Sequence, residues 1–291
     1  MIAAQREPFL AVMREVYGSA MSAPEFDWWF DRNPVGPRLV TMSEGGGQAL
    51  GVSAMSFFRM RLGGAERDVA FAVHAATTPA ARGRGVWSAL ELHNEEQAAR
   101  AGAPCVLGFT NPMAGPILVG KLGWRDLCRL RIWAHPKRLR RTGRGGLRGG
   151  AAPRFDERHG SADGSRGNRF VKDAAYLTWR YADSPREYRL VDGDRGYAVI
   201  GHALHKGYSA GLVCELAGRR TVGLLRRCLR AVDADVVIAF VNRGEERTYL
   251  AAGFVPTPES IRFIGKPLAD GVELPADRAA WRFTLGDLDF F

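Results

Sequence analysis

The sequence predicts an α/β protein with mixed sheets, built as two units in tandem. In the first half, an apolar run at residues 69–73 precedes a Gly-rich turn and then a helix-like stretch at residues 87–100. A similar order returns later, because a buried strand over residues 236–242 ends in Asn and leads into another helix. Between the halves, residues 138–167 are rich in Arg and Gly, which is typical of a tether.

The remaining elements follow from periodicity. The first helix is expected near the N-terminus, where apolar residues from Phe9 to Tyr17 recur at helical spacing. Strands are expected over residues 196–202 and 208–216. A capped helix over residues 173–181 and a periodic helix over residues 221–232 complete the pattern.

The turn at residues 77–87 has the composition of a phosphate-binding loop. Gly83 and Gly85 carry no Cβ, so the backbone can come close to a ligand. The following helix begins with unpaired N–H groups and the positive end of its dipole. Arg82 and Arg84 add forked donors that suit phosphate oxygens. We therefore expect a pyrophosphate to bind here.

The spacing of the Gly and Arg residues in the turn indicates which pyrophosphate-containing ligand is expected. A P-loop needs Lys followed by Ser or Thr, and the dinucleotide fingerprint needs Gly where Ser88 stands. With Arg82 and Gly85 in their places, the turn resembles R-x-x-G-x-[G/A], the coenzyme A loop of the GNAT acyltransferase superfamily. Three further matches come in the family's order. They are Thr77-Thr78-Pro79, the strand over residues 105–111 that ends in Asn111, and Lys121-Leu122-Gly123-Trp124.

This resemblance implies mostly antiparallel sheets with splayed central strands, flanked by helices, and acetyl-CoA or another acyl-CoA as co-substrate. In the family, the backbone of the fourth strand holds the thioester and pantetheine, and the loop holds the pyrophosphate. The positions that match are Ala75, Ala76 and Thr77 in the strand, Arg82, Gly83, Arg84, Gly85, Val86 and Trp87 in the loop, and Asn111 at the splay.

Two positions depart from the family pattern. Trp87 stands where Gly or Ala is usual, so its side chain either packs behind the loop or crowds the pyrophosphate. Many members place a Tyr four residues before the Gly of the second turn as the acid for the leaving thiolate. That position is Val119, which cannot donate a proton.

His74 and Tyr249 are the candidate catalytic side chains. His74 lies on the strand that would carry the coenzyme, and imidazole titrates near neutral pH, which suits a general base. Tyr249 stands four residues before Gly253 in the second half and is a candidate proton donor. Each has a plainer interpretation as a packed residue, Tyr249 beside Phe254. His202 and His205 lack a further ligand at suitable spacing, so no metal is expected.

The resemblance places the acceptor pocket in residues 26–37. Asp27, Asp31 and Arg32 are candidates to hold a cationic or hydroxylated amine, and Trp28 is a candidate to stack on a ring or sugar. The alternative is that Trp28 and Trp29 form the buried face of a helix.

We expect three parts in the chain: residues 1–133 with the coenzyme loop, an Arg/Gly-rich linker at 134–169, and a degenerate unit at 170–291. The strand-to-helix connection at residues 216–220 is too short and too poor in Gly for a second coenzyme loop. The pattern D-x-x-Y-L-x-W-R-Y from Asp173 resembles a bacterial tandem-GNAT subset that is often linked to polysaccharide or natural-product pathways.

Composition is consistent with a soluble protein in the cytoplasm. The chain has 291 residues, of which 46% are hydrophobic, and its four cysteines show no C-x-x-C spacing. No apolar run approaches the length of a membrane span, and the first helix lacks the features of a signal peptide. A net charge of +10 favours an anionic partner. Coenzyme A fits this charge, and the basic linker is either a solvated tether or a phosphate contact for RNA.

These observations predict an N-acyltransferase that moves an acetyl or other short acyl group from acyl-CoA to a primary amine. Direct attack on the thioester is expected, and the acceptor is a small molecule such as an amino sugar or natural-product intermediate. One alternative is a Fem-like aminoacyl transferase of natural-product or cell-wall biosynthesis, with aminoacyl-tRNA as donor. Another is a non-catalytic binding module. Oligomeric state is not indicated.

Overall fold

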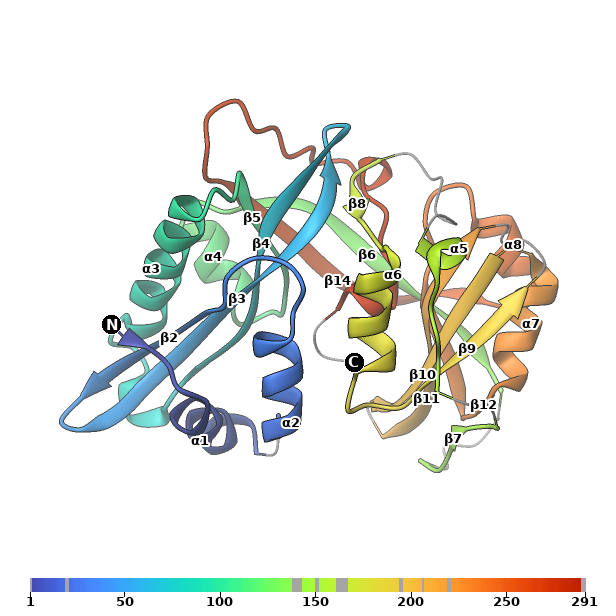
Figure 1. The fold of residues 1–291 in the computed structure, drawn as a ribbon, viewed down its shortest axis with the longest axis horizontal. Coiled ribbons are helices and arrows are strands. Elements are labelled where there is room, and N and C mark those ends of the chain that lie inside the picture. The colour runs from blue at the N-terminus through green and yellow to red at the C-terminus, as the bar shows by residue number, and fades with distance from the viewer. Residues whose placement is uncertain are drawn as a thin grey trace. The chain divides into compact units, whose positions relative to one another are not determined.

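The computed structural model describes residues 2–18, 21–137, 143–149, 152–160, 167–193, 196–205, 207–218 and 221–288 (Figure 1). The chain divides into two compact units. Unit 1 holds Met1–Cys128 and Arg262–Asp277, and unit 2 holds Arg129–Ile261 and Arg278–Phe291. We describe each unit by itself.

Unit 1 is a mixed sheet with strands in the order β1-β2-β3-β4-β5-β14. Neighbours are antiparallel, except that β4 and β5 are parallel. The strands are β1 (Ile2–Ala3), β2 (Leu39–Gly45), β3 (Gln48–Leu62), β4 (Ala65–Thr77), β5 (Cys105–Thr110) and residues 262–267 of β14 (Val255–Pro267). The helices are α1 (Arg6–Tyr17), α2 (Ala23–Phe26), which continues as a π-helix over Asp27–Asp31, α3 (Val86–Arg100) and α4 (Gly115–Lys121).

Helices cover both faces of this sheet, with α3 on one face and α1 and α2 on the other (Figure 1). Two serines of β3 mark the faces, since side chains alternate along a strand. Ser53 donates a hydrogen bond to Glu91 of α3, and Ser56 accepts one from the indole of Trp29 in the π-helix. The face under α1 and α2 is rich in aromatic rings, whereas α3 places polar side chains against the sheet.

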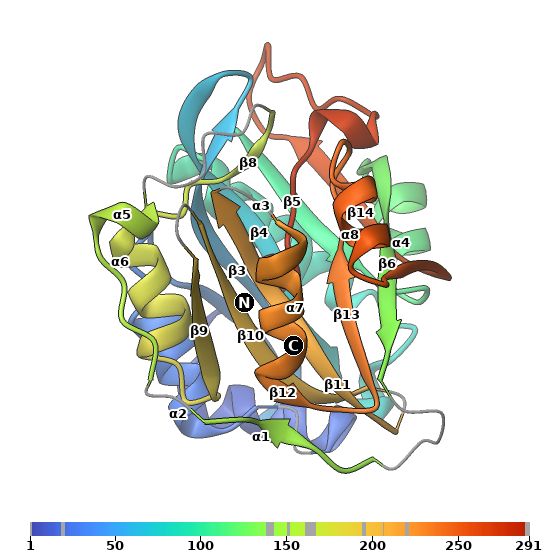
Figure 2. The same cartoon turned by 90° about the vertical axis from the view of Figure 1, so that its right-hand side faces the viewer.

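The strands of unit 2 pair in the order β9-β10-β11-β13-β6 (Figure 2). Here β11 and β13 are parallel, and the other neighbours are antiparallel. Its strands are β9 (Tyr188–Gly193), β10 (Gly196–His205), β11 (Tyr208–Gly218), β13 (Val236–Phe240) and residues 132–136 of β6 (Arg125–Pro136). A small two-stranded sheet pairs β7 (Gly146–Leu147) with β12 (Val232–Asp233), and β8 covers Arg169–Phe170. The helices are α5 (Glu157–Gly160), α6 (Ala174–Leu177), α7 (Val222–Arg230) and α8 (Glu246–Ala251), with a π-helix over Thr178–Ala182 after α6.

The unit boundaries differ from the expected ones. The sequence placed residues 170–291 in one C-terminal unit, but residues 262–267 pair with β5 and belong to unit 1. Part of the expected linker is strand, because residues 132–136 of β6 pair with β13 and β7 pairs with β12. The linker residues 138–142, 150–151 and 161–166 lie outside the described residues.

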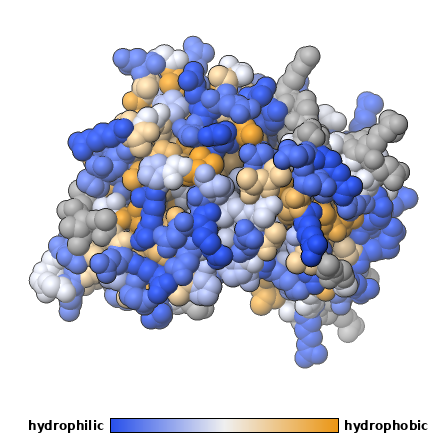
Figure 3. All heavy atoms as spheres, viewed as in Figure 1, coloured by the Kyte–Doolittle hydropathy of each residue, from blue (hydrophilic) through white to orange (hydrophobic). Residues whose placement is uncertain are grey.

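No helix in the described part of the chain is long and apolar enough to cross a membrane. The face shown in Figure 3 is mostly hydrophilic, with apolar side chains scattered among the polar ones. This distribution agrees with a chain in which 25% of the residues are charged.

The polar side of α3 contains a buried acid. Glu91 is 1% exposed, and one of its oxygens, Oε2, accepts the hydrogen bond from Ser53 at 3.0 Å. Burial in a low-dielectric environment disfavours the charged carboxylate and raises the pKa of Glu91 to about 7. The neighbouring charged groups are Glu95, on the same helix, and Lys266 of β14, and these two form an ion pair.

Glu91→Gln should change how the stability of unit 1 depends on pH. Because the folded pKa is raised above the unfolded value, wild-type stability falls as pH rises from about 4.5 to about 7, by about 3 kcal/mol in total. The Gln variant keeps an acceptor for Ser53 and should lose this slope. Urea unfolding at pH 5 and pH 8 measures the change in the free energy of unfolding, and Glu96→Gln, at an exposed position of α3, is the control. The same pH dependence in wild type and Glu91→Gln would contradict the assignment.

Unit 2 contains a buried ion cluster. The ammonium of Lys172 lies 2.7 Å from a carboxylate oxygen of Glu215 and 2.7 Å from one of Asp287. Thr284 Oγ1 accepts from the same ammonium, and the hydroxyl of Tyr181 donates to Glu215. The cluster therefore joins β11 to residues near the C-terminus.

Lys172→Met should destabilise unit 2 by about 3–5 kcal/mol, because it leaves two buried carboxyl groups without their cation. Urea unfolding followed by a probe in unit 2 measures the change. Arg226→Met is the matched control, since Arg226 is an exposed cation on α7. A loss no larger than that of the control would show that the cluster contributes little.

Candidate active site at the edge of strand β4

The pairing between β4 and β5 ends early. Only three residue pairs are in register, from Ala70 with Val106 to Ala72 with Gly108. Strand β4 continues to Thr77 and β5 to Thr110. The expected separation of the two central strands is therefore present, and no strand among the described residues pairs with the last part of β4 on its β5 side.

A β-bulge in β4 lies where the strands separate. Ser53 of β3 pairs with Ala75 and Met55 pairs with Ala72, so Ala54 faces both Val73 and His74. A bulge bends its strand and increases the local twist. We infer that this bend turns the end of β4 away from β5.

Hydrogen-bond directions show which backbone groups lie on the open edge. The N–H of Thr78 donates to the carbonyl of Leu50 in β3. Because successive residues of an antiparallel strand point alternately toward and away from the partner, Ala76 also faces β3, whereas Ala75 and Thr77 face away. The carbonyl of Ala75 does accept from a side chain outside β3, the hydroxyl of Tyr17. The open edge thus presents the N–H and C=O groups of Ala75 and Thr77.

The turn after β4 ends in an open helix N-terminus. A 3-10 turn over Pro79–Ala81 leads through Arg82, Gly83 and Arg84 to Gly85, which is the N-cap of α3. No side chain caps this helix, so its first N–H groups remain available for an anion. Gly83 and Gly85 have φ values of 76° and 73°, which only glycine adopts without strain.

The side chains of the turn differ in their exposure to solvent. Arg82 and Arg84 are exposed. Trp87 is partly buried and packs against the core cluster that includes Phe57, Leu118 and Trp124. Of the two possibilities open for Trp87, the structure therefore favours packing behind the turn.

The segment after β5 also serves a structural purpose. The side-chain oxygen of Asn111 accepts from the N–H groups of Met113 and Ala114 and so starts the turn into α4. Val119 on α4 packs against the core, and no proton donor stands at that position. After Gly123, the buried indole of Trp124 donates to Glu95 of α3 at 2.7 Å.

His74 lies in the aromatic layer on the α1–α2 face. Its ring contacts Trp29 and Phe30 edge-on, with centroids 6.2 and 6.0 Å away, and its Nε2 atom is buried. His74 directly precedes Ala75 on the bulge. The candidate base is therefore close in sequence to the open edge, and its side chain lies between the sheet and the segment expected to hold the acceptor.

Tyr249 is buried within unit 2. It is 2% exposed, belongs to that unit's core and meets Phe254 edge-on at 5.3 Å. The packing interpretation therefore describes Tyr249, and its proposed role as a proton donor is corrected. His202 forms a hydrogen bond with Ser209. Among the described residues, no cluster of His, Cys, Asp and Glu suitable for a metal occurs.

The expected acceptor residues are largely engaged elsewhere. Both carboxylate oxygens of Asp27 accept from Arg6, and Asp31 pairs with Arg38 at 2.8 Å. Trp28 is 1% exposed, so it belongs to the core, which corrects the stacking role considered for it. Arg32 is exposed at the end of the π-helix.

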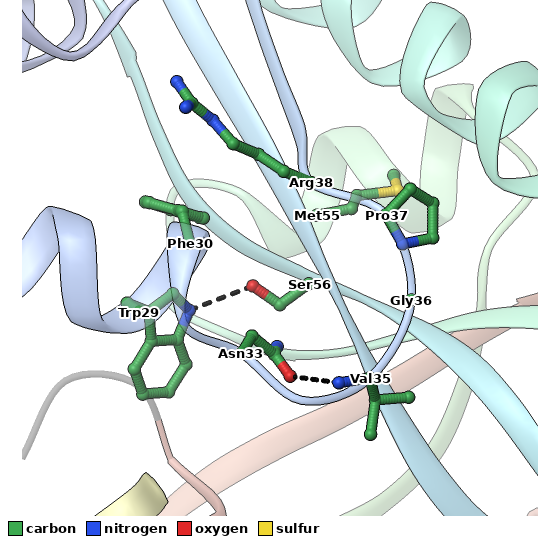
Figure 4. A pocket seen from close by; sticks show the side chains of 9 residues that line it. All are labelled: Trp29, Phe30, Asn33, Val35, Gly36, Pro37, Arg38, Met55 and Ser56. Carbon is green, nitrogen blue, oxygen red and sulfur yellow. Dashed lines mark hydrogen bonds between the residues drawn. The ribbon is translucent and has the colours of Figure 1, made fainter. Parts of the chain in front are cut away.

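A small cavity lies next to this segment (Figure 4). Its volume of about 10 Å³ is at the limit for one water molecule, so it does not hold an acceptor in this conformation. Asn33 closes the loop beside it, accepting from Val35 and donating to the carbonyl of Phe57. The cavity is lined by Trp29, Phe30, Asn33, Val35, Gly36, Pro37, Arg38, Met55 and Ser56.

The corresponding groups of unit 2 are satisfied internally. Parallel pairing of β11 and β13 also covers three residue pairs, from Ala210 with Val236 to Leu212 with Ile238. However, Thr221 caps α7 with its own side chain. Asn242, after β13, exchanges two hydrogen bonds with the backbone of Phe283. Residues 219–220 of the connection lie outside the described residues.

Two residues near the site are not indicated by the sequence. The spacing of Tyr17 marks it only as part of the apolar face of α1, yet its hydroxyl donates to the carbonyl of Ala75 in β4. Nothing in the sequence singles out Glu91, which is buried and accepts a hydrogen bond from Ser53, the residue paired with Ala75 in the sheet. Helical periodicity places Glu91 near the start of α3, but it does not reveal that the carboxyl group is buried.

Comparisons with known proteins agree with this geometry. Residues 3–125 match the sequence model of a family described as an acetyltransferase (GNAT) domain. A search of curated proteins gave no match. Among solved structures, a GCN5-related N-acetyltransferase from Kribbella flavida is similar, with 16% identity, a TM-score of 0.60, and coverage of 90% of this chain and 69% of that one.

Two other solved structures are similar in fold. Eis1 from Mycobacterium abscessus shows 13% identity and a TM-score of 0.59, with 90% of this chain and 71% of that chain covered. A putative acetyltransferase from Pyrococcus horikoshii shows 11% identity and a TM-score of 0.57, with 98% and 91% covered. Residues 3–125 are thus similar in sequence to a GNAT acetyltransferase domain, and the chain shares the fold of these solved structures.

Proposed function

We propose that this protein is an acyl-CoA-dependent N-acyltransferase that moves an acetyl or other short acyl group to the primary amine of a small molecule. The observation that carries the proposal is the uncapped N-terminus of α3, which directly follows the open edge of β4. A strand edge and an anion site in this order suit a ligand with an amide-containing arm and a pyrophosphate.

The residues fit the parts of acyl-CoA. The N–H groups that start α3, together with Arg82 and Arg84, would hold the pyrophosphate. The outward N–H and C=O groups of Thr77 would pair with a pantetheine amide, as an added strand would. The thioester would then lie beside Ala75, between Thr77 and the bulge.

The chemistry needs no covalent enzyme intermediate. The neutral amine attacks the thioester carbon, a C–N bond forms, and the C–S bond breaks to release the coenzyme A thiolate. The amine loses one proton and the thiolate gains one. Holding both reactants at the edge of β4, with an N–H aimed at the carbonyl oxygen, accounts for much of the rate enhancement expected.

On the acceptor side we propose an amino sugar or a natural-product intermediate. Acceptor recognition by Asp27 or Asp31 requires the incoming amine to displace Arg6 or Arg38 from them. An aminoacyl-tRNA donor would suit a turn crowded by Trp87, together with a position 119 that has no proton donor. Packing of Trp87 against the core leaves the turn open for a pyrophosphate and so favours acyl-CoA.

Arg82→Ala should weaken acetyl-CoA binding by about tenfold or more, because a charge-assisted phosphate contact contributes about 1.5–3 kcal/mol. Isothermal titration of wild type and variant measures this. The matched control is Arg61→Ala, since Arg61 is exposed on β3 and pairs with Glu66. Equal affinity in wild type and Arg82→Ala would remove the turn from the site, and absence of binding to wild type would reject the donor class.

We further propose that His74 takes the proton of the attacking amine. His74→Gln should lower kcat/KM by about 100-fold at neutral pH and abolish the acidic limb of the pH–rate profile, since a general base contributes about 10²–10⁴-fold. Thiol release with a panel of amines supplies the rates. His93→Gln on α3 is the control. An unchanged profile would assign His74 to the aromatic layer alone.

A further inference from the structure

Tyr17 brings a hydroxyl group to the open edge of β4. It is the last residue of α1, and Gly18, at φ 79°, ends the helix there. About half of the Tyr17 residue is exposed, at 51%. Its hydroxyl nevertheless donates to the carbonyl oxygen of Ala75 at 3.0 Å. An accessible phenol therefore lies within hydrogen-bond distance of the edge proposed to carry the thioester.

The geometry of an extended strand places this hydroxyl beside the Ala75 N–H. In such a strand the N–H and C=O of one residue point to the same side. The carbonyl of Ala75 points away from β3 to Tyr17, so its N–H points the same way. An oxygen that accepts from the Ala75 N–H would therefore lie next to the phenol oxygen of Tyr17.

We propose that the Tyr17 hydroxyl and the Ala75 N–H together donate hydrogen bonds to the thioester oxygen. This assignment rests on the proposed function, because it requires an acyl-CoA thioester along β4. When the amine nitrogen attacks, the carbonyl electron pair moves to the oxygen, and the two donors stabilise that charge. The pair returns as the C–S bond breaks, and Tyr17 keeps its proton throughout.

The hydrogen bond from Tyr17 to the Ala75 carbonyl suggests how the hydroxyl would become available to the thioester oxygen. A phenol has one O–H, which Ala75 now accepts. An acceptor amine that donates its own N–H to the Ala75 carbonyl takes the place of Tyr17. The hydroxyl then turns to the neighbouring thioester oxygen. The second donor is thus supplied when the amine is in position, which favours transfer over hydrolysis.

Tyr17 also supplies a hydrogen-bond donor in unit 1, whereas the side chain of Val119 supplies none. The role proposed here differs from that of a general acid, since no proton leaves the phenol. It also differs from that of a tie that holds α1 on the sheet, because a tie would act equally on every ligand.

Binding of stable analogues to Tyr17→Phe separates these roles without turnover. In the presence of an amine that the wild type acylates, we would titrate acetonyl-CoA, a ketone that keeps the acyl oxygen, and S-ethyl-CoA, which lacks it. The variant should bind acetonyl-CoA about three- to tenfold more weakly and S-ethyl-CoA unchanged, as expected for one hydrogen bond to the carbonyl oxygen. Equal changes for both analogues, or none, would overturn the proposal.

Kinetics supply the second readout. Tyr17→Phe should lower kcat by about 100-fold or more and leave the KM for acetyl-CoA within about threefold, as when one oxyanion donor is removed. The factor should be the same for different amines, since the oxyanion forms with each. An effect confined to the KM of the amine would instead make Tyr17 an acceptor contact and contradict the proposal.

Two controls make the result interpretable. Tyr208→Phe removes another partly exposed hydroxyl, in unit 2, and should change neither binding nor rate. An unchanged thermal midpoint for Tyr17→Phe shows that α1 stays folded. Failure of wild type to bind either analogue would reject the proposed function itself. A wild type that binds and turns over, beside an identical Tyr17→Phe, would reject only the role of Tyr17.

Discussion

The early end of the pairing between β4 and β5 is the constraint on which the proposed site depends. Beyond Ala72 and Gly108 the two strands no longer bond, and the bulge at Val73 and His74 carries β4 away. An unpaired strand edge is a liability in a folded protein, because its polar groups bond readily to any extended chain. Here the edge is short and leads directly to the uncapped N-terminus of α3, which suits the proposed ligand with an amide-containing arm and a pyrophosphate.

Local patterns predicted the part of the fold that local interactions determine. The turn around Gly83 and Gly85 was predictable because positive φ and an open helix N-terminus need those residues in that order. The bulge at His74 was not, since nothing in the residues Val73 and His74 distinguishes a bulge from a regular strand. The sequence alone does not decide whether Trp28 is buried, because an aromatic residue suits both a core and a binding surface.

The boundaries of the two units could not be predicted from local sequence patterns, for a different reason. The partner of β5 on its outer side is residues 262–267, which follow almost all of unit 2 in the chain. Periodicity identifies a strand but not its distant neighbour. The same limit applies to Tyr17, whose spacing marks the apolar face of a helix. Its hydrogen bond to Ala75 depends on how α1 meets β4.

The contrast between the two parallel pairs shows how one topology can be open or closed. In unit 1, α3 lacks a side-chain cap and the edge of β4 faces no strand. In unit 2, Thr221 caps α7, and the side chain of Asn242 pairs with the backbone of Phe283. The polar groups that would attract a ligand are thus satisfied by the chain itself. Residues near the C-terminus, through Asp287 and Thr284, are held there by Lys172 and Glu215.

The return of residues 262–277 to unit 1 has a consequence for synthesis on the ribosome. Domains usually fold in order as they emerge, the N-terminal one first. Here β5 cannot pair with its outer neighbour, and the buried Glu95 of α3 cannot pair with Lys266, until residues 262–267 have been translated. The nascent first unit therefore emerges with its sheet incomplete. A chain that terminates before these residues would leave the outer edge of β5 unpaired, and an unpaired strand edge is a site of aggregation.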